Sequence, residues 1–310
     1  MSKDPAVIVS ATRTPIGGLL GDFSGLAAWE LGAVAIRAAV ERAGIPGDAV
    51  DEVLLGCCLM AGQGQAPARQ AVLKAGLPQS AGAVTMSKMC GSGMRAAMCA
   101  HDMLLAGSAD VVIGGGMESM TNAPHLMFAR KGVKYGATQM YDHMAMDGLE
   151  DAYERGKAMG AFAESCVEKF GFTREAQDDF AIASTTRAKT ANEDGSFDWE
   201  MAPVTLPGKN GDTVIKFDEQ PFKAKLDKIR GLKPAFKKDG TITAASTMCV
   251  RLLAASFCPL YFADTSRHAG PMGAKPSGPL APGSMWWQVM QPLALASLSM
   301  SAFLASADHA

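Results

Sequence analysis

The chain has 310 residues, of which 48% are hydrophobic and 19% charged, and its formal net charge is −2. This length and composition exclude a disordered chain and indicate two domains, or one domain with a large insertion. The nearly balanced charge argues against nucleic acid as a partner. Seven cysteines without a CxxC pair favour reduced thiols in a cytoplasmic protein over disulfides, and they predict no metal site.

Short apolar runs alternate with helical spacing in the first part of the chain, and each helical pattern ends at a glycine. The start of the chain, Met1–Pro5, leads straight into the first run and shows no cleavable signal. Because the runs are apolar throughout, they predict an α/β fold whose sheet is covered on both faces. The expected strands are 6–10, 53–56, 83–86 and 111–113, and the expected helices are 27–43, 66–75 and 92–106.

A more polar region follows. Helical patterns are expected at 161–170 and 173–192, and residues 209–238 contain nine Lys or Arg against four acidic residues. We interpret this region as an exposed layer inserted between elements of the main sheet. Its basic stretch is either an ordinary solvated surface, which is the commoner case, or a cationic patch for a phosphorylated cofactor.

Cys90 stands out among the cysteines because it lies between an expected strand and an expected helix. Gly91 and Gly93 beside it permit unusual backbone angles and a close approach of a ligand. The helix start favours thiolate over thiol and can stabilise charge on a reacting thioester oxygen. Cys90 is therefore predicted to be an activated nucleophile. Cysteines in apolar runs are expected to be small buried hydrophobes instead, namely Cys57, Cys58, Cys99 and Cys166.

Four motifs, in the same order along the chain, resemble those of the thiolase family. The segment SKMCGSG at Ser87–Gly93 resembles the family's acyl-binding cysteine motif, and GGMESMTNAP at Gly115–Pro124 resembles its second signature. ATRTPIG at Ala11–Gly17 is similar to the family's first strand and turn, and GQAPARQ at Gly64–Gln70 to its dimer-side loop. The resemblance covers about residues 3–246 and is strongest to acetyl-CoA acetyltransferases. Ketoacyl synthases also place a cysteine on such a turn, but the second signature favours a thiolase.

The resemblance implies a layered αβαβα fold built from two similar α/β halves with a loop domain that covers coenzyme A. In this chain we expect the first half at 1–120, the loop domain at 121–246 and an unrelated tail at 247–310. The implied reaction is a ping-pong acyl transfer between acyl-CoA and acetyl-CoA, or the reverse cleavage, in fatty acid metabolism. A homo-oligomer, a dimer or tetramer, is also implied.

The resemblance assigns roles to individual residues. Cys90 is the implied acyl-thioester nucleophile, and no covalently bound cofactor is implied. The family has a histidine beside the pantetheine, and the corresponding residue in this chain is Ala158. This difference is tolerable because the histidine contact serves binding rather than catalysis. The positions implied to line the pantetheine of coenzyme A are Leu149, Met159, Phe236 and Ala244.

The composition changes after about residue 247. Residues 248–310 hold two of the 31 acidic residues and six of the 16 prolines. The resemblance implies a Gly-x-His-Pro motif, a Cys-x-Gly-Gly-Gly-x-Gly motif and an Asn-Glu-Ala-Phe-type turn here, and the tail contains none of them. His268 is followed by Ala269, and no glycine turn follows Cys249 or Cys258.

These features suggest a truncated product of a frame-shifted gene, without the second half and without turnover. The alternatives are a non-catalytic remnant that binds coenzyme A and a misfolded product. We expect residues 250–262 to fill the slot of a further strand, and an apolar face of the sheet to be exposed. Residues 285–305 carry no charge and are long enough to span a membrane, but Pro292 and the many Ser and Ala favour disorder or loose packing.

Overall fold

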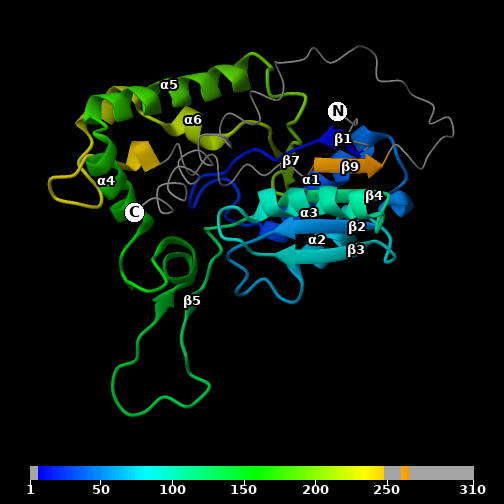
Figure 1. Cartoon of the computed structure of the whole chain (residues 1–310), viewed down its shortest axis with the longest axis horizontal. Helices are drawn as coiled ribbons and strands as arrows, with labels where there is room; N and C mark the ends of the chain where they lie inside the picture. The colour runs from blue at the N-terminus through cyan, green and yellow to red at the C-terminus, as the bar shows by residue number, and fades with distance from the viewer. Residues whose placement is uncertain (1–5, 248–259, 265–310) are drawn as a thin grey trace. The chain divides into compact units, whose positions relative to one another are not determined.

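The computed structural model describes residues 6–247 and 260–264, all within one compact unit, Met1–Arg267. Its main sheet has five strands in the order β1-β9-β4-β2-β3 (Figure 1). Strand β2 is parallel to both of its neighbours, whereas β9 is antiparallel to β1 and β4. The strands are β1 (Ala6–Ala11), β2 (Glu52–Gly56), β3 (Gly82–Met86), β4 (Val111–Gly116) and β9 (Leu260–Asp264).

Three helices cover the sheet. Helices α1 and α2 pack on one another and on one face, where Ile36, Val53 and Ile113 are fully buried. Helix α3 packs on the opposite face, against Leu54 and Val112. Alternate residues of β2 and β4 thus enter two different cores, and the expected α/β fold is confirmed. The helices are α1 (Ala28–Ala43), α2 (Pro67–Ala75) and α3 (Ser92–Ala106), each followed by a glycine in the left-handed conformation.

The expectation of a sheet covered on both faces holds for β2 and β4 but is wrong for β1. Val7, Ile8 and Val9 are 36%, 40% and 43% exposed, although consecutive side chains of a strand point to opposite faces. Strand β1 is at the edge of the sheet, and α3 touches it far less than it touches β2 and β4. Helix α3 also exposes Met98 and Leu105. An exposed apolar surface, as expected, therefore lies over β1 and α3.

A strand forms at Leu260–Asp264, between β1 and β4, and overlaps the end of the expected stretch 250–262. The remaining residues of the tail, including 285–305, lie outside the described residues. Among the residues that the structure describes, no helix is long and apolar enough to cross a membrane.

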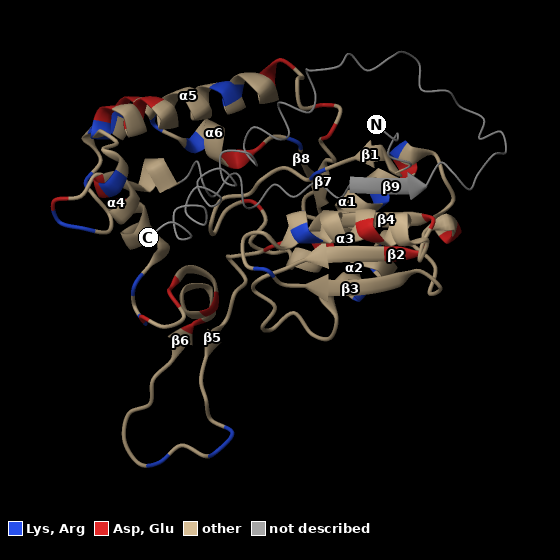
Figure 2. Ribbon diagram, viewed as in Figure 1, with Lys and Arg blue, Asp and Glu red and all other residues tan. Residues whose placement is uncertain are grey.

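The polar region forms a hairpin, two long helices and several short elements. The expected helices at 161–170 and 173–192 are confirmed, each within two residues. Helix α5 buries only four residues, Asp178, Ala181, Thr185 and Asn192, as expected of an exposed layer. In Figure 2 the loop between β5 and β6 carries Lys and Arg but no Asp or Glu. The elements are β5 (His125–Leu126), β6 (Tyr141–Asp142), η2 (Ala145–Leu149), α4 (Met159–Phe170), α5 (Arg174–Glu193), β7 (Val204–Leu206), β8 (Thr213–Ile215), α6 (Glu219–Lys223) and η3 (Leu226–Gly231).

A buried ion-pair network joins this region to the start of the chain. The guanidinium of Arg13 donates to both carboxylate oxygens of Asp218, at 2.7 and 3.1 Å, and to Glu200 at 2.5 Å. Asp218 also accepts from the amide of Asn192 at 3.0 Å. Burial alone would lower the pKa of Arg13, but the two carboxylates outweigh it and raise that pKa. Residues more than 170 positions apart are thus held together, and Arg13 belongs to the first motif singled out in the sequence.

Gly56 allows the first turn of α3 to lie directly against the end of β2. A Cβ atom at this position would stand 2.4 Å from the backbone N of Gly93 and from the carbonyl carbon of Ser92. Backbone atoms cannot move aside as the end of a flexible side chain can. Only glycine fits here without displacing the helix.

Gly56→Ala is therefore expected to destabilise the protein by about 1–3 kcal/mol or more, because it overpacks a contact between backbones. Gly25→Ala is the matched control, since a Cβ there meets nothing within 4 Å. Urea unfolding followed by circular dichroism measures both variants. Equal midpoints for the two would contradict the close approach of β2 and α3.

Candidate active site

The turn from β3 to α3 holds Cys90 at the surface. Cys90 is exposed and directly precedes Gly91, the N-cap residue of α3. Met89 before it has a φ of +48°, a left-handed conformation that is uncommon for a residue with a side chain. The expected place of Cys90 on a strand–turn–helix is confirmed, while its role as a nucleophile stays a prediction.

Ser92 organises this turn. Its side chain is buried, and its Oγ accepts a hydrogen bond from the backbone N of Lys88 at 2.8 Å and donates one to the carbonyl of Met89 at 2.5 Å. Both partners precede Cys90 in the chain. The hydroxyl of Ser92 thus closes the loop around Cys90 and fixes the direction in which the thiol leaves the backbone.

Two backbone amides next to Cys90 are used within the turn. The N–H of Gly91 donates to Lys88 O at 3.1 Å, and the N–H of Ser92 donates to Met89 O at 3.0 Å. These two N–H groups are therefore not available to a thioester oxygen, although the sequence predicts that N–H groups at this helix start stabilise its charge. The contribution of α3 at Cys90 is therefore its dipole rather than these two N–H groups.

The other cysteines differ in exposure. Cys57 is buried and Cys58 and Cys99 are half-buried, but Cys166 is exposed on α4, so its expected burial is wrong. Helix α4 turns only Gly160 and Glu164 inward, and Cys166 lies on its outer side.

Glu118 holds the segment after β2 in place. Its carboxylate accepts from the backbone N–H of Cys58 at 2.8 Å and of Leu59 at 3.1 Å, and from the thiol of Cys57 at 3.5 Å. Burial, with a further contribution from this carboxylate, raises the pKa of Cys57 and of Cys58 to about 12. Both thiols are thus neutral near pH 7, unlike an activated nucleophile.

The positions expected to contact coenzyme A come from distant parts of the chain, and three of them lie around the start of α4. Leu149 ends η2 and Met159 begins α4, and a β-bridge between Glu150 and Ala158 sets these two residues side by side. The ring of Phe236 packs on Gly160, where a Cβ would stand 2.3 Å away.

The segment that carries Ala244 is bound to α4 as well. The buried carboxylate of Glu164 accepts from the backbone N–H groups of Thr241 and Ile242, at 2.8–3.1 Å. Glu164 lies one helical turn after Gly160, so the segment that carries Ala244 is held on the same side of α4 as Phe236. Met159, Phe236 and Ala244 are exposed.

Two contacts connect this group to the segment beside Cys90. A Cβ on Gly148 would stand 3.1 Å from the side chain of Leu59, and the Nε2 of His143 accepts from the N–H of Ala61 at 3.3 Å. His143 also contacts Asp147 at 2.7 Å through Nδ1, so its second ring nitrogen is held as well. The residues before Leu149 therefore rest on residues 59–61, next to Cys58.

The basic stretch 209–238 is partly neutralised by acidic neighbours. Lys223 pairs with Glu219, Arg230 with Asp179, and Lys237 with Glu168. Because of these three ion pairs, much of the stretch 209–238 is better interpreted as an ordinary solvated surface than as a cationic patch.

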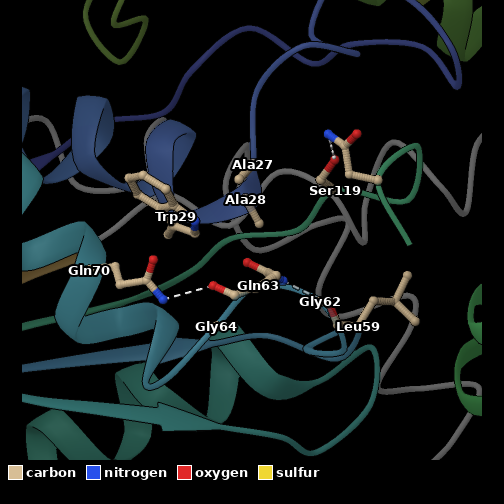
Figure 3. A pocket seen from close by; sticks show the side chains of 10 residues that line it. Ala27, Ala28, Trp29, Leu59, Gly62, Gln63, Gly64, Gln70 and Ser119 are labelled. Atoms are coloured by element: carbon tan, nitrogen blue, oxygen red, sulfur yellow. Dashed lines mark hydrogen bonds between the residues drawn. The ribbon is translucent and has the colours of Figure 1, made fainter. Parts of the chain in front are cut away.

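A cavity of about 360 Å³ is lined neither by Cys90 nor by any of the four positions named above (Figure 3). It is bounded by Trp29, Leu59, Gln63, Gln70, Ser119 and Asn122. Gln70 donates to the carbonyl of Gln63 at 2.8 Å across one wall. The cavity thus adjoins the expected dimer-side loop and not the nucleophile turn.

Comparison with known proteins decides the family. Residues 6–251 match the family described as "Thiolase, N-terminal domain". The chain belongs to the thiolase family. The resemblance read from the four motifs is confirmed, and the match ends close to the point where the composition changes.

Three proteins similar to this chain are named acetyl-CoA acetyltransferase. An acetyl-CoA acetyltransferase of Cupriavidus necator is 48% identical over 243 residues, covering 77% of this thiolase chain and 62% of the relative. One of Shinella zoogloeoides is 41% identical over 275 residues, covering 88% and 69%. A solved acetyl-CoA acetyltransferase of Syntrophomonas wolfei has a TM-score of 0.75 at 38% identity, covering 84% of this chain and 64% of that one. The chain thus spans about three fifths of the length of the first of these relatives.

Some residues of this thiolase site were not identified from sequence. Ser92 lies inside the motif Ser87–Gly93 and Glu118 inside the motif Gly115–Pro124. Membership in these motifs was the only indication of a role for either residue. Glu164 is one of several acidic residues on a helical pattern and carried no signal. Its burial depends on residues 77 positions away.

Ser92→Ala is expected to loosen the Cys90 turn, because it removes the acceptor for Lys88 N and the donor to Met89 O. The loss of a buried hydrogen-bonding group costs about 1–3 kcal/mol. Thermal unfolding and the rate of Cys90 alkylation by iodoacetamide measure the effect. Ser165→Ala, at an exposed position of α4, serves as the control, and an unchanged alkylation rate in Ser92→Ala would argue against the role of Ser92.

Proposed function

We propose that this chain binds acyl-CoA and accepts its acyl group on Cys90, as the first step of an acyl-CoA:acetyl-CoA C-acetyltransferase reaction. The observation that carries the proposal is the connected set of contacts from the Cys90 turn, through residues 57–61 and η2, to Met159 and Phe236. The names of the relatives support the same chemistry. We propose that this acyl transfer takes place in the cytoplasm and that the protein is a homo-oligomer.

The proposed step is a simple exchange of thioesters. The Cys90 thiolate attacks the carbonyl carbon of acyl-CoA, and the coenzyme A thiolate leaves as the new thioester forms. Exposure of Cys90 gives the acyl-CoA substrate access to the sulfur. In the second step of the full reaction, acetyl-CoA deprotonated at its methyl carbon attacks the acyl-enzyme, and the Cys90 thiolate leaves as the new C–C bond forms.

The proposed binding site for the pantetheine arm is formed by Leu149, Met159, Phe236 and Ala244. Three of these side chains are exposed although two are large and apolar, so a ligand that covers them gains hydrophobic free energy. Glu164 and the bridge between Glu150 and Ala158 hold their backbones in place.

A second candidate is binding of coenzyme A without turnover. It is favoured by the sequence itself, because the 310 residues contain neither a Gly-x-His-Pro nor a Cys-x-Gly-Gly-Gly-x-Gly motif. Loss of members of a catalytic unit leaves only a small residual rate. We therefore expect this polypeptide to form no detectable acetoacetyl-CoA.

The acyl-enzyme separates these candidates. After incubation with acetyl-CoA, we expect an acetyl group on the tryptic peptide Met89–Arg95, and none in Cys90→Ala. Cys166→Ala, which removes another exposed thiol, keeps the modification. Mass spectrometry of the peptides provides the measurement. Binding of coenzyme A with an unmodified peptide would support the second candidate, and an acetyl group on Cys166 alone would refute the assignment of Cys90.

Phe236→Ala is expected to weaken coenzyme A binding about tenfold, or about 1.4 kcal/mol, because it removes the ring that packs on Gly160. Phe170→Ala is the control, since Phe170 is exposed at the end of α4, outside the proposed pantetheine site. Isothermal titration with coenzyme A compares the two variants. If both bind as tightly as the unaltered chain, the ligand lies elsewhere.

A further inference from the structure

A second thiol lies beside the Cys90 turn. The Sγ of Cys58 is 3.6 Å from the Oγ of Ser92, the same atom that bonds to the backbone of Lys88 and Met89. Since the single hydroxyl proton of Ser92 goes to Met89, the Cys58 thiol is the donor in this contact. Cys58 therefore points at the loop that carries Cys90 and is held there by a hydrogen bond.

The backbones of the two cysteines are also brought close by the sheet. Strand β2 pairs with β3 in parallel up to Gly56 and Met86, and the N–H of Cys57 donates to Met86 O at 2.9 Å. The segment after β2 thus continues alongside the segment after β3. The contact between Cys58 and Ser92, two residues after Cys90, joins the ends of these two segments.

Cys90 and Cys58 differ in exposure, as the attacking and resolving thiols of a reactive pair do. Cys90 is exposed and stands at a helix start, where a reagent reaches it first. Cys58 is half-buried and protonated, so it resists direct attack. Cys57, next to Cys58, is buried and bonded to Glu118 and Gln63, on the α1–α2 side of β2.

We propose that Cys58 and Cys90 form an intramolecular disulfide when the protein meets a hydroperoxide, so that Cys58 is a resolving thiol for an oxidised Cys90. The Cys90 thiolate attacks one peroxide oxygen, the O–O bond breaks, and hydroxide leaves, which gives a sulfenic acid. The sulfur of Cys58 then attacks the sulfenic sulfur, and water leaves as the S–S bond forms. Peroxide is reduced by two electrons, and the two thiols supply them.

Two consequences follow from the pair. The disulfide blocks Cys90 toward any electrophile, and it shields the sulfur from further oxidation to the irreversible sulfinic acid. A dithiol reductant reverses the reaction. The second step depends on the thiolate of Cys58, whose pKa burial raises to about 12. Closure of the disulfide is therefore expected to accelerate roughly tenfold for each unit of pH between about 7 and 9.

The experiment treats the full chain with a small excess of hydrogen peroxide, alkylates the remaining thiols and maps the tryptic peptides. Cys58 lies in Ala43–Arg69, Cys90 in Met89–Arg95 and Cys166 in Ala158–Lys169, so the three thiols are read separately. We expect a linked pair of the first two peptides and an alkylatable Cys166. A non-reducing gel shows the oxidised protein as a monomer.

Cys58→Ser and the matched Cys57→Ser identify the partner. Serine keeps a hydrogen-bond donor at either position, and circular dichroism checks the fold. The linked pair persists in Cys57→Ser and is lost in Cys58→Ser. Dithiothreitol restores alkylation of Cys90 in the unaltered chain but not in Cys58→Ser, where oxidation proceeds to sulfinic acid.

Three results would overturn the proposal: a linked pair that survives in Cys58→Ser, a covalent dimer, or sulfinic Cys90 with fully alkylatable Cys58 in the unaltered chain. Because the readout is a peptide mass, it is independent of acyl transfer. A chain that forms the disulfide but no acyl-enzyme would refute the proposed function and leave this inference standing.

Discussion

The contact between the end of β2 and the first turn of α3 is the constraint on which the site depends. Gly56 has no Cβ, so Ser92 and Gly93 lie directly on the strand. The position of α3 then determines the conformation of the Cys90 turn, because the Ser92 hydroxyl bonds to both residues before Cys90. A backbone contact inside the fold thereby fixes the orientation of an exposed thiol.

Carboxylates that bind backbone amides assemble the rest of the site. Glu118 holds the segment after β2, and Glu164 holds the segment before Ala244. A carboxylate that accepts several N–H groups satisfies them and orders an otherwise irregular loop. This arrangement lets residues from loops far apart in sequence form one surface, next to a thiol that needs access to solvent.

The positions of four strands along the chain, the three covering helices and the place of Cys90 could be predicted from sequence, because they depend on local patterns. Apolar runs bounded by glycine defined β2, β3 and β4, and a glycine ended each of α1, α2 and α3. The exposure of β1 and of Cys166 could not be predicted, since burial depends on which elements pack against a residue. The antiparallel direction of β9 is likewise a matter of pairing and not of composition.

The sequence by itself determined the family, through four motifs in order, and the single cysteine placed on a glycine-flanked turn. Only the tertiary structure showed that Leu149, Met159 and Phe236 lie together around the start of α4, and that Cys58 points at the Cys90 loop. The physical reason is the range of the interactions. Turn and helix signals act over a few residues, whereas the contacts of Gly148, Glu164 and Ser92 join segments 34 to 89 positions apart.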